Sequence, residues 1–197
     1  MPRTQQQRRD ETVAKLLDAS IDTIVEVGYA RASAAVITKR AGVSVGALFR
    51  HFDTMGDFMA ATAYEVLRRQ VELGSKRAAE IPADRPALDA LLAILRDVTR
   101  NPVNAVMYEL MIAARTDEKL RATLQDVLTE YGEKIYDAVR AQPGTESVPD
   151  KTLGVLVMTL INTFDGAALV RGVLPQPELD AEQLALLATL IDEKYGA

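Results

Sequence analysis

Cysteine is absent from this chain of 197 residues, and histidine occurs only once, at His51. Without cysteine the chain forms no disulfide bond, no thiolate zinc site and no cysteine nucleophile. A single histidine excludes a metal site built from several histidines. The sequence also lacks a glycine-rich loop of the kind that cradles phosphate. The sequence therefore contains no recognisable catalytic residues, and we do not expect an enzyme. We also expect no metal and no cofactor.

Long apolar runs are also lacking. Residues 1–11 are polar and basic, which does not fit a secretory signal. The longest uncharged apolar run covers residues 152–164 and ends at Asp165, so it is too short to cross a bilayer. We therefore expect no membrane partner and a cytoplasmic protein.

Positive charge is scarce overall, because the net charge is −5. Residues 1–60 hold eight Lys and Arg against seven Asp and Glu, a net charge of +1, whereas the remainder carries −6. This asymmetry favours nucleic-acid contact by the N-terminal part. Such contact would depend on where individual charges lie, since the bulk potential of that part is nearly neutral.

Apolar residues recur at helical spacing through most of the chain, and no strand-like alternation is visible. The pattern predicts an all-α fold of about nine helices. A break is predicted at residues 81–86, and capping signals predict helix starts at Asn101-Pro102, Asp117 and Asp180. The predicted helices cover residues 10–27, 33–41, 44–52, 54–79, 88–98, 101–111, 117–135, 151–173 and 180–195.

Residues 33–52 are the most informative segment, because they predict two short helices joined by a tight turn. Gly42 supplies the turn and Ser44 caps the second helix. Val36 and Ile37 are expected to be buried, and Leu48 is expected to pack between the helices. This is a helix-turn-helix arrangement, in which the second helix enters the major groove of DNA.

The exposed face of the second helix, with the two helix starts, would contact DNA bases and phosphates. Two alternatives stay open, since Phe49 can belong to the core and His51 can be a structural histidine. Arg40 and the basic tail Arg3, Arg8 and Arg9 are further candidates. The predicted DNA-binding residues are Ser33, Lys39, Ser44, Val45, Ala47, Phe49, Arg50 and His51.

Gly28-Tyr29 and the run Ala41-Gly-Val-Ser-Val-Gly-Ala-Leu-Phe-Arg-His-Phe52 resemble the N-terminal domain of the tetracycline-repressor (TetR) family. The resemblance implies a dimeric transcriptional regulator, usually a repressor, which binds palindromic DNA and is released by a small molecule in its C-terminal domain. It implies a DNA-binding domain at 1–56 and a ligand-binding and dimerisation domain at 57–197. Three positions depart from the family pattern, because Phe49 stands where tyrosine is frequent, Met55 where lysine is frequent and Ala35 where a polar residue is frequent.

The segment 153–173 is apolar nearly all round, so it must be buried on every side. With the last helix it would form a four-helix interface between two copies of the chain. The alternative is burial inside a single copy. The predicted dimerisation residues are Leu153, Leu156, Leu160, Gly166, Leu184, Leu187, Leu190 and Ile191.

A ligand pocket is expected among the C-terminal helices, with adaptable methionine and aromatic lining and a few polar groups. For each residue, core packing is the alternative role. The lining would favour an apolar or amphipathic effector. The predicted ligand-binding residues are Asn104, Met107, Tyr108, Met111, Met158, Asn162, Phe164 and Asp165.

Two functions follow from these features. The first is a ligand-responsive transcriptional regulator that binds operator DNA as a homodimer. The second is a helical small-molecule-binding protein with a weakened DNA-binding head, which the near-neutral charge of residues 1–60 and the residues at Met55 and Ala35 favour.

Overall fold

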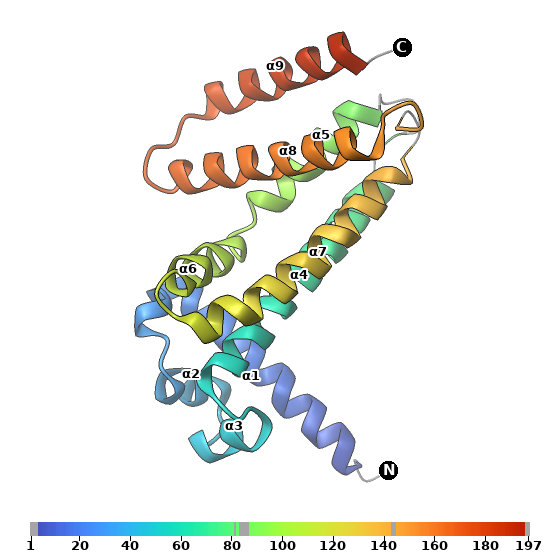
Figure 1. Cartoon of the computed structure of the whole chain (residues 1–197). Helices are drawn as coiled ribbons and strands as arrows, with labels where there is room; N and C mark the ends of the chain where they lie inside the picture. The colour runs from blue at the N-terminus through green and yellow to red at the C-terminus, as the bar shows by residue number, and fades with distance from the viewer. Residues whose placement is uncertain (1–3, 81, 83–86, 143–144, 196–197) are drawn as a thin grey trace. The chain divides into compact units, whose positions relative to one another are not determined.

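The computed structural model describes residues 4–80, 82, 87–142 and 145–195. The described chain is helical and contains no strand, which confirms the all-α class (Figure 1). Besides the short 3₁₀ turn η1 (Tyr29–Arg31), nine helices lie in the described part. They are α1 (Gln5–Val27), α2 (Ala34–Ala41), α3 (Val45–His51), α4 (Met55–Ala79), α5 (Ala87–Thr99), α6 (Asn104–Ala114), α7 (Glu118–Arg140), α8 (Asp150–Arg171) and α9 (Pro177–Tyr195).

Backbone contacts divide the chain into two compact units. Unit 1 comprises Met1–Arg69 and Pro102–Thr129, and unit 2 comprises Gln70–Asn101 and Glu130–Ala197. Helices α4 and α7 each begin in unit 1 and end in unit 2. The predicted break at residues 81–86 lies, apart from Pro82, outside the described residues.

Helix α1 begins five residues before the predicted start, because a capping box fixes its first turn. The Thr4 hydroxyl accepts a hydrogen bond from the Gln7 N–H at 3.2 Å, and the Gln7 side chain accepts one from the Thr4 N–H at 2.9 Å. These polar residues carry no apolar periodicity, so the pattern alone did not reveal the start.

Two predicted helix starts are wrong. Helix α6 begins at Asn104, after a turn at Pro102 and Val103, and not at Asn101-Pro102. Helix α9 begins at Pro177, where proline suits the first helical position, three residues before the predicted capping box. The predicted start at Asp117 is confirmed, since its carboxylate accepts a hydrogen bond from the Leu120 N–H at 3.0 Å.

The core of unit 1 forms around α1, which contacts α2, α3, η1 and α6. The side chains of Leu16, Ile37, Leu48 and Phe58 are fully buried there. Burial of each such side chain stabilises the fold by about 1.5–3 kcal/mol. Helices α2 and α3 therefore pack on α1 through buried side chains.

The core of unit 2 forms where α5, α8 and α9 pack together. Leu92, Leu160 and Phe164 form one buried cluster, against which side chains of α9 pack. Val139, Leu153 and Val157 form a second cluster at the end of α7. The inner face of α8 is thus occupied within a single chain.

Candidate functional sites

The α2–α3 pair has the capped geometry that the sequence predicts. The Ser33 hydroxyl accepts a hydrogen bond from the Val36 N–H at 3.4 Å, and the Ser44 hydroxyl accepts one from the Ala47 N–H at 3.1 Å. Gly42 ends α2 with φ +68°, in the left-handed region that side chains with a Cβ disfavour. Both helix starts therefore hold free backbone N–H groups in a fixed direction, as a phosphate contact requires.

The structure places the predicted DNA-binding residues on α3 and at the two helix starts, except for Lys39, which lies in the last turn of α2. Ser33, Lys39, Ser44, Val45, Phe49 and Arg50 are exposed, and Ala47 and His51 are half-buried. Phe49 is 44% exposed, so it lies outside the core, whereas Phe52 packs on Phe58 with ring centroids 4.9 Å apart. An exposed phenylalanine beside an exposed valine and an arginine gives α3 an apolar and cationic outer face.

One expectation for α2 is wrong, and a further candidate residue of α2 has contacts of its own. Val36 is 44% exposed instead of buried, because Ile37 and Thr38 take the inner face of this eight-residue helix. Arg40 is held by the Glu26 carboxylate and by the Thr23 hydroxyl at 3.3 Å, so its charge is balanced by α1.

Glu109 connects helix α6 to the first residue of η1, which follows the end of α1. The Glu109 carboxylate accepts a hydrogen bond from the Tyr29 backbone N–H. A Cβ at Gly28, which has φ +83°, would lie 3.4 Å from the same carboxylate. Burial, with a smaller contribution from the charge of Asp117, raises the pKa of the Tyr29 phenol above its usual value. Glu109 is the only charged residue of α6; this marks it as unusual in the sequence but does not identify its partner.

The predicted ligand-binding residues fall in different units. Asn104, Met107 and Tyr108 are buried in the core of unit 1, and the Asn104 amide donates a hydrogen bond to the Tyr108 hydroxyl at 3.3 Å. Their burial fits core packing, which is the alternative role for these three residues. Met111 on α6 is partly exposed.

The four predicted ligand-binding residues of α8 belong to unit 2. Met158 and Asn162 are exposed, and Phe164 is buried in the core cluster. Asp165 acts on Tyr131, because its negative charge adds to burial in raising the pKa of that phenol. The Tyr131 hydroxyl donates a hydrogen bond of 2.8 Å to the Gln70 side chain, which is buried.

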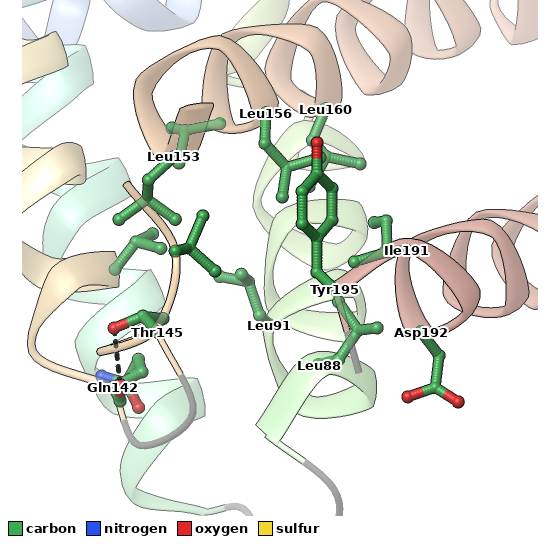
Figure 2. A pocket seen from close by; sticks show the side chains of 13 residues that line it. Leu88, Leu91, Gln142, Thr145, Leu153, Leu156, Leu160, Ile191, Asp192 and Tyr195 are labelled. Atoms are coloured by element: carbon green, nitrogen blue, oxygen red, sulfur yellow. Dashed lines mark hydrogen bonds between the residues drawn. The ribbon is translucent and has the colours of Figure 1, made fainter. Parts of the chain in front are cut away.

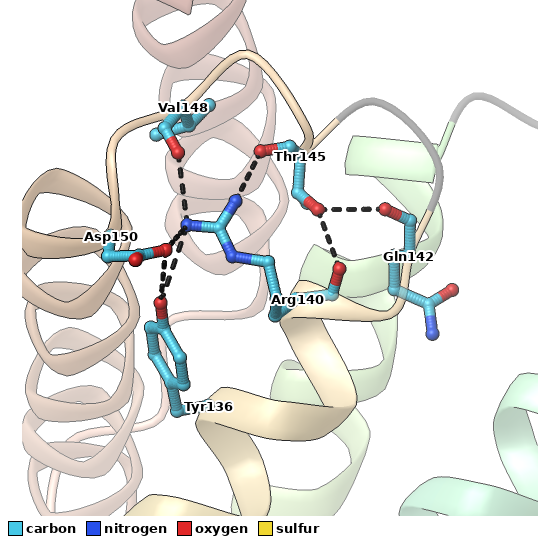
Figure 3. Close-up of polar contacts among 6 residues, drawn as sticks. All are labelled: Tyr136, Arg140, Gln142, Thr145, Val148 and Asp150. Atoms are coloured by element: carbon cyan, nitrogen blue, oxygen red, sulfur yellow. Dashed lines mark hydrogen bonds and ion pairs between the residues drawn. The ribbon is translucent and has the colours of Figure 1, made fainter.

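A mostly apolar, partly open pocket of about 160 Å³ lies within unit 2 (Figure 2). Three predicted dimerisation residues of α8 and one of α9 line it, which the sequence pattern did not anticipate. The lining residues are Leu88, Leu91, Val139, Gln142, Thr145, Val148, Leu153, Leu156, Val157, Leu160, Ile191, Asp192 and Tyr195. The Arg140 guanidinium donates hydrogen bonds to the carbonyl oxygens of two of them, Thr145 at 2.6 Å and Val148 at 3.0 Å (Figure 3).

The predicted dimerisation face is wrong for Leu153 and Leu160. Both are buried inside the unit, as are parts of Leu156, Leu184, Leu187 and Ile191, so burial within one chain accounts for them. Gly166 and Leu190 are exposed. A groove between α8 and α9 is lined by four exposed apolar side chains, those of Val170, Leu174, Leu179 and Leu186. We call these four, with Gly166, the α8–α9 face.

Helix α8 is long and apolar enough to cross a membrane by length and composition alone, contrary to the expectation from its uncharged run. A single helix of this kind is a weak indication, because core helices of soluble proteins share these properties. Across the described ranges, no group of three or more His, Asp or Glu residues is arranged to hold a metal ion.

The serine-capped helix pair with an exposed second helix defines a helix-turn-helix protein. Residues 16–62 match the model of the family described as "Bacterial regulatory proteins, tetR family". An "Uncharacterized HTH-type transcriptional regulator" from Mycobacterium bovis is 71% identical over 191 residues, covering 97% of this chain and 98% of that protein. The chain therefore belongs to the tetR family of transcriptional regulators.

Solved structures show the same fold. A transcriptional regulator from Rhodococcus sp. Rha1 aligns with a TM-score of 0.71 at 23% identity, covering 94% of this chain and 98% of that chain. The multidrug binding protein EbrR, complexed with imidazole, aligns with a TM-score of 0.67 at 23% identity, covering 90% and 93%.

Proposed function

We propose that this regulator is a ligand-responsive repressor that binds palindromic operator DNA as a homodimer and is released by a small apolar or amphipathic effector. The observation that carries the proposal is the exposed outer face of α3, with Val45, Phe49 and Arg50 beside capped helix starts. Phosphates would bind at the N–H groups near Ser33 and Ser44, and side chains of α3 would contact base edges. The protein would act in the cytoplasm.

Homodimerisation is proposed through the α8–α9 face. Monomeric proteins rarely expose contiguous apolar surface of this kind. Four side chains of this face are each more than half exposed, namely Val170, Leu174, Leu179 and Leu186. Gly166 also lines the groove, and because glycine has no side chain another helix could approach closely there. A two-fold axis there would pair two α3 helices for successive major grooves, which lie about 34 Å apart.

The functional division is proposed at residues 1–56 for DNA binding and 57–197 for ligand binding and dimerisation. An effector would act by favouring a state with lower operator affinity. The structural neighbour named as a multidrug binding protein supports a small-molecule effector.

The test is a gel-shift and footprinting experiment over the DNA upstream of the chain's own gene. We expect salt-sensitive binding to a palindrome, because phosphate contacts release counterions. Arg50→Ala combined with His51→Ala should abolish this binding. Only sequence-independent binding, or none, would contradict the proposal.

One observation favours the second candidate, a small-molecule-binding protein with a weakened DNA-binding head. Arg40 is engaged by Glu26, and this engagement removes one cation from the surface of α2 that DNA would meet. Operator affinity that is unchanged by the Arg50→Ala, His51→Ala pair would support this candidate over the repressor.

A further inference from the structure

The side chains that α3 offers to a partner are hydrocarbon up to its last turn. All seven residues of this helix are described, and Leu48 is its fully buried residue. Val45 is 41% exposed and Phe49 is 44% exposed. Between them, Gly46 has only a hydrogen atom as its side chain and Ala47 has a methyl group. The side chains of these four outward positions therefore have no hydrogen-bonding group for a base edge.

The polar side chains of the motif lie at the ends of α3. The Ser44 hydroxyl precedes the helix and accepts a hydrogen bond from the Ala47 N–H at 3.1 Å, so it is engaged in capping. Arg50 and His51 lie in the last turn. The N-terminal residues of a recognition helix contact base edges, whereas basic side chains beyond them can reach phosphates. Base recognition is therefore left to the apolar side chains of α3.

Val45 and Phe49 are neighbours on one side of α3. Residues four positions apart on a helix have Cβ atoms about 5–6 Å from each other. Successive base pairs of DNA are about 3.4 Å apart along the helix axis. The two side chains thus form one apolar contact that spans one or two base pairs.

The major groove presents one apolar substituent, the C5 methyl group of thymine. The other groups that distinguish the base pairs there are hydrogen-bond donors and acceptors. A guanine or cytosine edge pressed against valine or phenylalanine would lose bound water without gaining a partner, which is unfavourable. A thymine methyl group would instead bury apolar surface against apolar surface, which is favourable. The exposed chemistry of α3 thus matches thymine.

We propose that Val45 and Phe49 are specificity-determining residues, which recognise the C5 methyl groups of thymines in each half-site. Arg50 and His51 supply contacts to the DNA backbone, which do not depend on the base sequence. This recognition rests on the operator-binding function proposed above, and it defines the base chemistry that the chain selects. It follows that 5-methylcytosine, which carries the same methyl group, replaces thymine better than cytosine does.

The test uses the full-length protein and the operator that it selects from random DNA. Each thymine of the half-sites is replaced in turn by deoxyuridine, which removes the methyl group and keeps every hydrogen-bonding group. Affinity is measured by fluorescence anisotropy at fixed salt. We expect a loss of about fourfold at one or two thymines of a half-site, the effect of burying one methyl group. Thymines in the flanking DNA serve as the control and should show no change.

A cytosine series separates the methyl group from the thymine carbonyl group. At each sensitive position, the thymine–adenine pair is replaced by a cytosine–guanine pair that carries either cytosine or 5-methylcytosine. We expect the 5-methylcytosine operator to bind about fourfold more tightly than the cytosine operator. Both series alter only the DNA, so neither depends on the folding of a protein variant.

Protein variants assign each methyl group to a side chain. Val45→Ala and Phe49→Ala should each lose the sensitivity to deoxyuridine at one position, so that the thymine and uracil operators bind equally there. Arg50→Ala is the matched control on the same helix. It should bind every operator more weakly and keep the fourfold difference between them, because a phosphate contact is independent of sequence.

The outcomes separate methyl recognition from operator binding. A selected operator whose affinity is unchanged by deoxyuridine at every half-site thymine, or one whose half-sites contain no thymine, would overturn methyl recognition and leave operator binding standing. A deoxyuridine effect that persists in both Val45→Ala and Phe49→Ala would overturn the assignment to these two residues. Selection of no sequence would overturn the proposed function, and methyl recognition with it.

Discussion

Phe49 is a residue of α3 that departs from the pattern of the tetR family. The family pattern often carries tyrosine at this position, whose hydroxyl can bond to phosphate, whereas the phenylalanine ring offers only apolar contact. The structure leaves that ring 44% exposed beside Val45 and Arg50. We infer that Phe49 contributes by packing against sugar or thymine methyl groups, with Arg50 supplying the charge.

Phe49→Ala is predicted to lower operator affinity about tenfold, equivalent to about 1.4 kcal/mol, by removing that apolar contact. The measurement is fluorescence anisotropy with a labelled operator at fixed salt. Val25→Ala, which removes an exposed side chain of α1, serves as the control and should leave affinity unchanged. Equal affinity of Phe49→Ala and the parent would place the ring outside the interface.

Tyr131 predicts a pH dependence of stability. Burial, with the charge of Asp165 second, raises the pKa of its phenol well above 10, so the folded protein keeps a proton that the unfolded chain loses above pH 10. The stability linked to this proton is complete below pH 10 and falls as pH rises from there toward the folded pKa. Tyr131→Phe should therefore show a smaller drop in Tm between pH 9 and pH 11 than the parent. Parallel Tm curves for the two proteins would contradict this assignment.

The residues whose roles could be read from the sequence are those that act through local geometry. Ser33, Gly42 and Ser44 are recognisable because caps and turns depend on neighbours within three or four positions. Glu109 was missed, since its partner Tyr29 lies 80 positions away and no local rule connects them.

At the scale of elements, the α2–α3 turn depends on Gly42. Its φ of +68° is disfavoured for residues with a Cβ by about 1–2 kcal/mol. Gly42→Ala is predicted to lower the free energy of unfolding by about this amount, as measured by urea denaturation. Gly46→Ala is the matched control, because a methyl group there has space within helix α3 and should leave stability equal or higher. Similar losses in both variants would argue against a specific role of the turn.

Helix boundaries and faces were predicted unevenly, for physical reasons. In amphipathic helices such as α1 and α7, the spacing of the apolar residues predicts which face is buried. Helix α8 does not, because it is apolar all round, so its pattern could not distinguish the face buried in the unit from the face left exposed. Leu153 and Leu160 were therefore assigned to the wrong surface, while Gly166 was assigned to an exposed one.

At the scale of the whole molecule, the proposal assigns one partner to each of two exposed faces, DNA to the outer face of α3 and a second copy of the chain to the α8–α9 face. A repressor of the proposed type needs both, since one α3 helix contacts only one half-site. Loss of the dimer should thus reduce operator affinity without altering α3.

Gly166→Glu is predicted to convert the protein to a monomer and to weaken operator binding more than tenfold through the loss of the second half-site. A Cβ at Gly166 meets no atom within 4 Å in the single chain, so the substitution should leave the protomer folded. Light scattering after gel filtration gives the oligomeric state. Gly132→Glu on α7, where a Cβ also has open space, should remain a dimer. A dimeric Gly166→Glu protein would place the interface elsewhere.

Selection of bound sequences from random DNA measures whether α3 recognises a palindromic DNA sequence. We predict enrichment of a two-fold symmetric sequence with half-sites about one helical turn apart. The Phe49→Ala, His51→Ala double variant should fail to enrich the same sequence. Enrichment of no sequence by the parent, or of the same palindrome by the double variant, would contradict the account.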